Sequence, residues 1–269
     1  MTNEPFTFGI PLIPRASAAN WPLVEALLDL TLTSVLAQTQ QDFRIIIAGH
    51  DRPKLLMAPD TFVFIQADWT AEAVHSDNRD SGRKKHVINQ HVLDSGGGLL
   101  MFLDADDWVE RRLVEAARAA IKPEHVGGLI ESGFATDFRS LRTAPIPHPG
   151  IFGEGFDKVC GSSTVARLRP DDPCPLRRDP STILHEHYRW AEVAAAHGGT
   201  LARLDVLGNY VVNTSTNHSE VHGPFADWRR VFTAGINREG RVVDDPFLRT
   251  FGLDLTRLRE TSERFFPRH

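Results

Sequence analysis

The chain has 269 residues, of which 41% are hydrophobic and 24% are charged, so its composition is that of an ordinary folded protein and excludes global disorder. The formal net charge of -5 gives no general attraction to nucleic acid, and a nucleic-acid partner is not expected. The two cysteines, Cys160 and Cys174, are too few for a disulfide framework and form no Cys-x-x-Cys pair that would indicate a zinc site.

The sequence carries no visible targeting or membrane-spanning segment. Residues 1–6 have neither the basic part nor the apolar part of a secretory signal. No apolar run approaches the roughly 20 residues that are needed to cross a bilayer. We therefore expect a cytoplasmic protein whose contact with a membrane, if it has one, is peripheral.

Strands and helices alternate through the first half of the chain. Apolar runs predict strands at 6–10, 43–48, 61–66 and 99–103. Apolar residues at helical spacing predict a helix over 24–35, with Asn20 as its N-cap. Further helices are expected at about 86–93 and about 110–121. This order predicts an α/β fold in which helices cover both faces of a largely parallel sheet.

The second half of the chain is less regular. Strand-like pieces are expected at 128–132, 163–168, 200–206 and 207–212, and a helix is expected at 187–197. Pro145, Pro147 and Pro149 interrupt the middle of this half and indicate irregular chain.

Three aspartates directly follow the apolar strand predicted at 99–103, namely Asp104, Asp106 and Asp107. A buried strand carries such charges only where it emerges from the core. Ligands of parallel sheets bind beyond the carboxyl ends of the strands. These aspartates and Asp51, which follows the strand at 43–48, are therefore expected to meet in one crevice.

Two carboxylates separated by one residue can face the same way at a strand end. Their hard oxygen atoms suit Mg²⁺ or Mn²⁺, and a diphosphate can complete the shell of metal ligands. The alternative is structural, because Asp106 or Asp107 could simply cap the helix that follows. The apolar strand before the cluster and the helix after it favour the binding site.

The segment around this cluster resembles a known family. Phe102-Leu-Asp-Ala-Asp-Asp107 is similar to the Asp-x-Asp motif of glycosyltransferases with the GT-A fold, above all those of glycosyltransferase family 2. Phe8–Pro14 is similar to the family's first strand and its Pro-bearing loop, and Leu32–Thr39 is similar to the end of its first helix. The likeness covers 6–111, and a looser one follows Thr182.

The resemblance implies a GT-A fold, which is a Rossmann-like α/β domain with a mixed, largely parallel sheet. It implies the metal-dependent, inverting transfer of a sugar from a nucleotide sugar, with UDP as the expected nucleotide, to a glycan or another hydroxyl acceptor. Mn²⁺ or Mg²⁺ is the expected cofactor. Residues 1–222 would form the domain, in which 1–122 bind the nucleotide sugar and 123–222 face the acceptor. Residues 223–269 would add a helical extension whose aromatic side chains pack on the domain or face a membrane or a partner.

Carried over position by position, the resemblance implies a set of nucleotide-sugar-binding residues: Pro11, Asp51, Asp104, Ala105 and Asp106. Asp51 would lie near the base, Asp104 near the ribose or the sugar, and Asp106 on the metal. The family usually has Asp-Gly-Ser where this chain has His50-Asp-Arg-Pro53, so the identity of the base stays open.

A basic run, Arg83-Lys-Lys85, stands in a polar segment that we expect to be a loop before the helix at 86–93. Arg and Lys side chains bind phosphate oxygens, and related glycosyltransferases carry donor-binding residues in this loop. We therefore expect Arg83 and Lys84, in preference to Lys85, to bind the donor diphosphate. The alternative is a solvated basic turn.

Glu186-His187 stands where family 2 enzymes have a Glu-Asp pair whose Asp is usually the general base. Either side chain can accept a proton near neutral pH, so the base role is assigned jointly to Glu186 and His187. Farther along, His218 is expected to bind the metal, with His222 as the alternate. The alternative there is an ordinary surface loop.

Two other functions remain open. An apolar strand followed by Asp-x-Asp also describes haloacid-dehalogenase-type phosphatases, in which Asp104 would attack phosphorus. Against that function, several strand–helix units precede the motif, and Trp108 stands where a small hydroxyl residue is expected nearby. The other alternative is a GT-A domain that binds a nucleotide or glycan without catalysis, which the histidine at the base position allows. The sequence names neither the sugar, the acceptor nor the oligomeric state.

Overall fold

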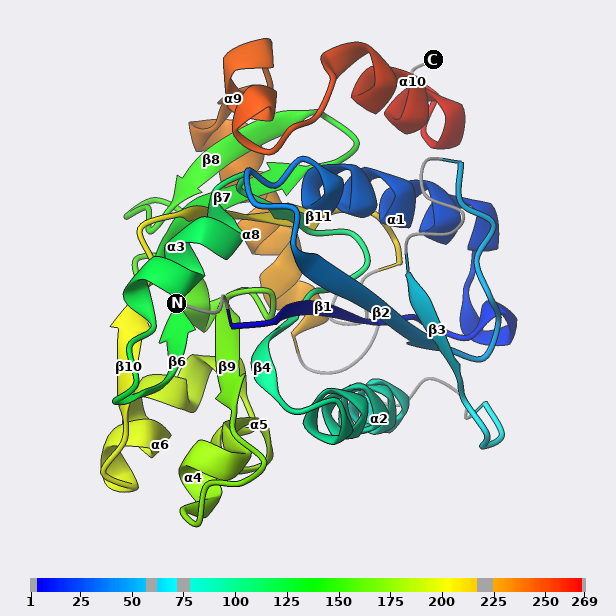
Figure 1. Ribbon diagram of the computed structural model, residues 1–269. Helices are drawn as coiled ribbons and strands as arrows, with labels where there is room; N and C mark the ends of the chain where they lie inside the picture. The colour runs from blue at the N-terminus through cyan, green and yellow to red at the C-terminus, as the bar shows by residue number, and fades with distance from the viewer. Residues whose placement is uncertain (1–3, 57–61, 72–77, 217–224, 268–269) are drawn as a thin grey trace.

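The larger of two β-sheets runs through the centre of the molecule (Figure 1). The computed structural model describes residues 4–56, 62–71, 78–216 and 225–267. Within them, this sheet consists of β1 (Phe6–Pro11), β2 (Phe43–Gly49), β3 (Val63–Gln66), β4 (Gly98–Phe102), β6 (His125–Leu129), β9 (Thr164–Leu168) and β10 (Thr200–Arg203).

The strands of the large sheet lie in the order β10-β6-β9-β4-β1-β2-β3. Strand β9 runs antiparallel to both of its neighbours, β4 and β6, whereas the other pairings are parallel. The fold class predicted from the sequence, an α/β domain with a mixed, largely parallel sheet flanked by helices, is confirmed.

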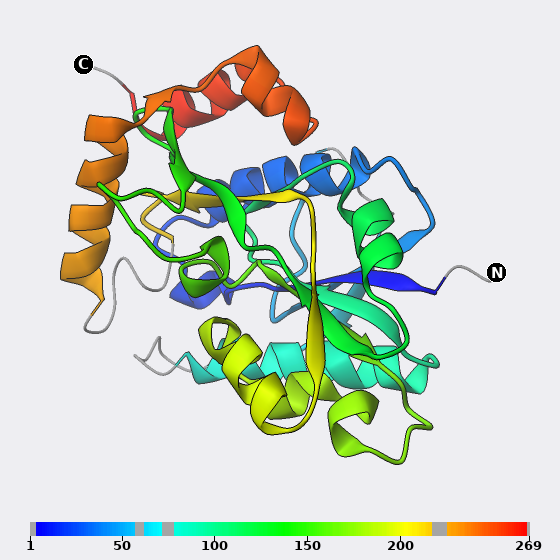
Figure 2. The same cartoon turned by 90° about the vertical axis from the view of Figure 1, so that its left-hand side faces the viewer.

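Helices cover both faces of the large sheet. Helix α2 (Arg79–Asp94) contacts β1, β2 and β4, and α1 (Trp21–Leu36) lies on the opposite face, as the two perpendicular views agree (Figures 1 and 2). The Asn20 side chain accepts a hydrogen bond from the Leu23 N–H and caps α1, as predicted. The apolar runs of β1 and β2 are therefore buried between two helical layers.

Strand β4, which leads to the aspartate cluster, begins at a position that requires glycine. Gly98 has φ +122°, and a Cβ there would stand 2.5 Å from the Pro5 carbonyl oxygen. The glycine-rich break therefore lets β4 start close beside β1. Strand β4 ends at Phe102, so the aspartates follow its carboxyl end as predicted.

The starts of helices α2 and α3 differ from the prediction. Helix α2 begins at Arg79, so the basic run at 83–85 lies inside the helix, and the expected loop there is wrong. Its first turns are polar because they face solvent and a cavity, which left no apolar period to detect. Helix α3 (Leu113–Ala120) begins later than expected, because β5 (Trp108–Val109) precedes it and pairs with β11 (Leu207–Val212).

A second sheet was not predicted. Its further strands are β7 (Ser132–Asp137), β8 (Arg142–Ile146) and β12 (Arg241–Val242), and the order is β12-β8-β7-β11-β5. The prolines had indicated irregular chain, yet Pro145 lies within β8 opposite Phe134 of β7. Strand β12 pairs with Arg142 and Thr143 of β8 and does not reach Pro145. Among the described strands, Pro145 therefore has a partner on one side of β8 alone, where a missing N–H is tolerated.

The remaining helices are shorter or C-terminal. They are α4 (Pro175–Arg178), α5 (Pro180–Leu184), α6 (Trp190–Ala196), α8 (Ala226–Glu239), α9 (Asp245–Thr250) and α10 (Leu255–Phe265). Short 3-10 turns occur at η1 (Arg15–Ser17), η2 (Phe156–Lys158) and η3 (His187–Arg189). None of the helices in the described part of the chain combines the length and apolar character that crossing a bilayer requires.

Candidate functional site

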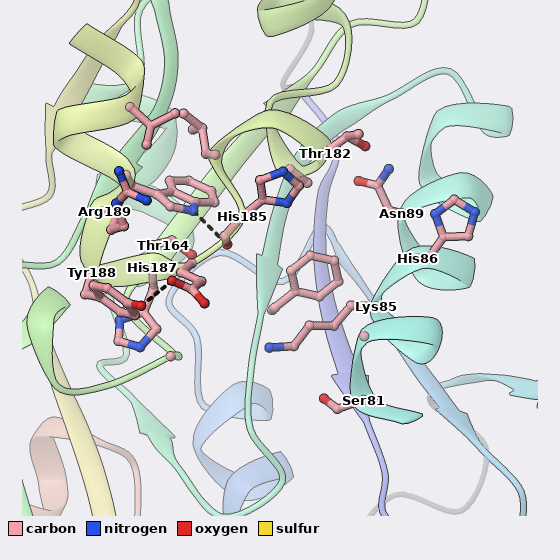
Figure 3. A pocket seen from close by; sticks show the side chains of 18 of the residues that line it. Ser81, Lys85, His86, Asn89, Thr164, Thr182, His185, His187, Tyr188 and Arg189 are labelled. Carbon is pink, nitrogen blue, oxygen red and sulfur yellow. Dashed lines mark hydrogen bonds between the residues drawn. The ribbon is translucent and has the colours of Figure 1, made fainter. Parts of the chain in front are cut away.

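A cavity of ≈ 910 Å³ lies beside the carboxyl end of β4. Helix α2 forms one wall through Ser81, Lys85 and Asn89, and η3 with the preceding Glu186 forms another. Figure 3 shows the two walls facing each other, with Lys85 on one and His187 on the other. The cavity therefore joins segments from the two halves of the chain.

Asp104 lies next to this cavity, behind Gly161. A Cβ at Gly161 would stand 3.2 Å from the Asp104 Oδ2 and 3.9 Å from the His187 Cδ2. The Asp104 N–H also donates to the Ser162 Oγ at 2.9 Å, which fixes the chain after β4 against the loop around Gly161. The absence of a side chain at Gly161 thus lets Asp104 and His187 approach each other.

The last aspartate of the cluster has a structural environment. Asp107 is fully buried and accepts hydrogen bonds from the Ser162 Oγ at 2.7 Å, the Cys160 Sγ at 3.3 Å and the Val211 N–H at 2.9 Å. Burial raises the pKa of its carboxyl to about 7, the charge of Asp104 adds to the rise, and the three hydrogen bonds oppose it. Asp107 therefore ties the motif to β11 and to the 160–162 loop.

Of the two middle residues of the cluster, Asp106 is buried and Ala105 is partly buried. Asp106 is 8% exposed, and Ala105 packs against the main hydrophobic core. The alternative in which Asp106 or Asp107 caps the next helix is wrong, because the N-cap of α3 is Arg112. The aspartates are thus not explained by helix capping.

The basic run at 83–85 is divided by the geometry of α2. Lys84 is fully buried and its Nζ donates to the Leu12 carbonyl oxygen at 2.6 Å and to the Asp80 carboxylate. Lys85, which we had ranked behind its neighbours, lines the cavity, with its Nζ 5.7 Å from the centre of the Phe102 ring. Neither Arg83 nor Lys84 is among the cavity-lining residues.

Lys84 belongs to a second group at the same edge of the sheet. Pro11 ends β1, and Asp51, which follows β2, accepts a hydrogen bond from the Arg15 N–H at 2.9 Å. Burial lowers the pKa of Lys84, while Asp80 and Asp51 oppose this effect. Since β1, β2 and β4 are parallel neighbours, Asp51 and Asp104 emerge at the same sheet edge. Neither is among the cavity-lining residues, so their meeting in one crevice stays a prediction.

The two candidate bases have different surroundings. Glu186 is exposed and accepts a hydrogen bond from the Tyr188 hydroxyl. The His187 Nδ1 lies 2.6 Å from the Asp157 carbonyl oxygen, which can only accept, so Nδ1 carries the proton and Nε2 is left with a free lone pair. Burial lowers the pKa of His187, although the hydrogen bond to Asp157 and the charge of Asp104 oppose this effect. The imidazole is therefore neutral near pH 7 and able to accept a proton.

The predicted metal site has two carboxylates in the described part of the chain. Asp104 and Asp106 flank one residue at the strand end, and no group of three His, Cys, Asp or Glu side chains among the described residues is placed to hold an ion. Mg²⁺ in proteins is commonly held by one or two carboxylates together with substrate phosphates, so this donor set fits a metal that arrives with a diphosphate. His218 and His222 lie outside the described residues.

Several cavity residues were not predicted from the sequence. Ser81, Lys85 and Asn89 follow each other at four-residue spacing, which places them on one face of α2. That spacing would have identified them if the helix had been predicted to start at Arg79. Ser181 carried no sequence signal, because α5 meets the cavity only through the tertiary fold.

No protein-family model matches the chain, and no curated protein matches it. Among solved structures, the chain is similar to the crystal structure of a protein from Desulfovibrio desulfuricans G20 that is named as a candidate nucleotide-diphospho-sugar transferase. The sequence identity is 12% and the TM-score is 0.38, over 91% of this chain and 100% of the other. A likeness of that size leaves family and function to the chemistry of the site.

Proposed function

We propose that the protein is a metal-dependent glycosyltransferase that moves a sugar from a nucleoside diphosphate sugar, with UDP as the nucleotide, to a hydroxyl group of a glycan or another acceptor. The observation that carries the proposal is the approach of Asp104 and His187 around Gly161, beside a cavity that also holds Lys85. A carboxylate at a strand end, a cation and a neutral imidazole supply the metal ligand, the diphosphate contact and the base that this reaction needs.

The donor would lie along the edge formed by β2, β1 and β4. Lys85 is half-buried at the cavity, where its ammonium can offset the charge of the diphosphate. Asp104 and Asp106 would hold Mn²⁺ or Mg²⁺ together with the diphosphate oxygens, and the bound ion offsets the charge that develops on the departing nucleoside diphosphate. Pro11 and Asp51, which end β1 and follow β2, would contact the nucleoside.

His187 is our candidate for the base that activates the acceptor. Its Nε2 takes the proton of the acceptor hydroxyl as the hydroxyl oxygen forms a bond to the anomeric carbon. The bond from that carbon to the diphosphate oxygen breaks on the opposite side, which inverts the anomeric configuration. Glu186 is the less suitable base because the Tyr188 hydroxyl already donates to its carboxylate.

Thermal unfolding with UDP and Mn²⁺ tests the donor half of this proposal. A ligand that binds only the folded protein raises its melting temperature, and a concentration of 100 times the Kd stabilises by about 2.7 kcal/mol. We expect UDP to raise the melting temperature of the wild type in the presence of Mn²⁺, and Asp104→Asn and Asp106→Asn to abolish the shift. Asp227→Asn, which removes an exposed carboxylate on α8, is the matched control and should keep it.

A lack of any shift in the wild type, with several nucleoside diphosphates and several metals, would overturn the proposal. Hydrolysis of p-nitrophenyl phosphate that depends on Asp104 would favour the phosphatase instead.

A measurement of donor consumption separates an enzyme from a binding domain. We expect His187→Ala to stop it and Glu186→Gln to reduce it less, with UDP binding kept in both. No turnover by the wild type with a broad panel of acceptors would favour the binding domain.

A further inference from the structure

The part of the cavity next to α5 carries polar atoms that have no hydrogen-bond partner within the described structure. These are the Asn89 Oδ1 and the Ser181 Oγ, and both residues line the cavity. Asn89 is 2% exposed, and buried polar atoms in folded proteins normally have a partner. The missing hydrogen-bond partners of these two atoms point to a bound group that supplies them.

The orientation of the Asn89 amide is fixed by a third residue. The Asn89 Nδ2 donates to the Asp179 Oδ2 at 3.0 Å, and the same carboxylate accepts from the Thr182 hydroxyl at 2.6 Å as it caps α5. Because a carboxylate only accepts hydrogen bonds, the amide NH₂ must face Asp179 and the amide oxygen must face away from it. Figure 3 shows this oxygen turned towards the side of the cavity where His185 lies.

The chemistry of the two unpaired atoms selects the ligand group. An amide oxygen requires a donor, so a phosphate or carboxylate anion does not complete it. Hydroxyl groups supply both partners, because a hydroxyl can donate to the Asn89 Oδ1 and a hydroxyl can accept from the Ser181 Oγ. An ammonium group would instead favour a carboxylate, and that of Asp179 is already taken by Asn89 and Thr182.

The surrounding surface suits the rest of a sugar ring. Leu184, Trp190 and Val193 also line the cavity, and the partly exposed Val193 offers an apolar contact to the C–H faces of a ring. The Trp190 Nε1 donates to the His185 carbonyl oxygen at 3.3 Å, so the indole is held in place. A polar pair beside an apolar surface is the arrangement that orients a ligand in a pocket.

We propose that Asn89 and Ser181 form a pair that binds hydroxyl groups of a sugar ring and so determines which sugar the enzyme accepts. The inference rests on the proposed function for the origin of that ring, which belongs either to the donor or to a saccharide acceptor. The recognised chemistry is the same in both cases, since ring hydroxyl groups complete both side chains.

Ser181→Ala tests the pair. The Ser181 hydroxyl has no partner in the described structure, so its removal should leave the melting temperature unchanged. Loss of one hydrogen bond to the sugar should weaken binding about 3- to 10-fold. We would titrate wild type and variant with UDP, UDP-glucose and UDP-N-acetylglucosamine in Mn²⁺, and measure the KM of saccharide acceptors. Ser140→Ala is the matched control, because it removes another unpartnered buried hydroxyl that does not line the cavity.

The outcomes separate the two sources of the ring. Weaker binding of a UDP-sugar with unchanged binding of UDP supports the pair and assigns the ring to the donor. An unchanged donor Kd with a raised acceptor KM supports the pair and assigns the ring to the acceptor. Equal losses for UDP and UDP-sugars, or no change in any constant, would overturn the inference.

Failure of the proposed function gives a different result. If the wild type binds no nucleoside diphosphate, titration with free glucose, maltose and N-acetylglucosamine still tests the pair. Binding that Ser181→Ala weakens and Ser140→Ala does not would support the pair on its own. No saccharide binding by the wild type would overturn it.

Discussion

The core side and the cavity side of α2 hold two lysines that are adjacent in sequence. Lys84 is fully buried and its ammonium is held by the Leu12 carbonyl oxygen and the Asp80 carboxylate. Lys85 is half-buried at the cavity, near the Phe102 ring. Adjacent residues of an α-helix point about 100° apart around its axis. This rotation separates Lys84, which holds α2 to the end of β1, from Lys85, which can contact a ligand.

The aspartate cluster is divided in the same way. Asp107 is enclosed by the 160–162 loop and β11, whereas Asp104 approaches His187 beside the cavity. In both pairs the side chains are chemically alike, and the direction in which each leaves its element decides its surroundings. The buried member of each pair should therefore determine stability, and the other member should determine ligand binding.

Replacement of the two lysines tests this division most strongly. Lys84→Met leaves the largely buried Asp80 carboxylate without its lysine partner and should lower the free energy of unfolding by about 3 kcal/mol. Lys85→Met should change it by less than about 0.5 kcal/mol and weaken UDP binding about tenfold. Urea unfolding and UDP titration measure the two effects. Equal losses of stability in the two variants would contradict the division.

The pH dependence of stability tests the buried aspartate. The pKa of Asp107 is about 7 in the folded protein, above its ordinary value of 3.8, so between these values the folded chain binds a proton that the unfolded chain releases. The free energy of unfolding therefore falls as pH rises through this range and stays low above it. Relative to Asp107→Asn, which keeps an acceptor for the Val211 N–H, the wild type should lose about 4 kcal/mol between pH 4 and pH 8.

Urea unfolding of both proteins over that pH range, without metal or nucleotide, makes the measurement. The asparagine variant is the reference because it cancels the contribution of every other titrating group. Parallel curves for the two proteins would mean that Asp107 does not carry the proton. A steeper fall of the free energy of unfolding in Asp107→Asn than in the wild type would contradict the raised pKa of Asp107.

The sequence predicts best those parts of the fold that rest on local patterns. Continuous apolar runs identified β1, β2 and β4, and Asn20 with the apolar period after it identified α1. Because parallel strands end at a common edge, these elements also predicted that Asp51 and Asp104 emerge together. Local patterns were thus sufficient for the sheet edge that carries Asp51 and Asp104.

Features that depend on tertiary contacts could not be predicted in this way. The start of α2 escaped detection because its first turns are polar, and the choice between Lys84 and Lys85 depends on that start. Strands β8 and β12 are short, and Pro145 argued against the former. The unpaired state of the Asn89 oxygen is visible only when Asp179 is seen to hold the amide nitrogen.

The smallest expected effect concerns a lysine that acts on the cavity through the backbone. The Lys158 Nζ donates to the Tyr188 carbonyl oxygen at 2.6 Å and lies 3.2 Å from the Asp157 carboxylate, so it joins η2 to η3. The Asp157 carbonyl oxygen accepts the hydrogen bond of the His187 Nδ1 across the same contact.

Lys158→Met should therefore loosen the His187 imidazole and lower the turnover of donor about 3- to 10-fold, with unchanged UDP affinity. Lys158→Arg should restore most of the turnover. Nitrogen-15 spectra of His187 should show the Nδ1–H tautomer in the wild type and a mixture of tautomers in Lys158→Met, whether or not turnover is detected. A parallel fall in UDP affinity, or an unchanged tautomer, would mean that Lys158 only stabilises the fold and does not position the His187 imidazole.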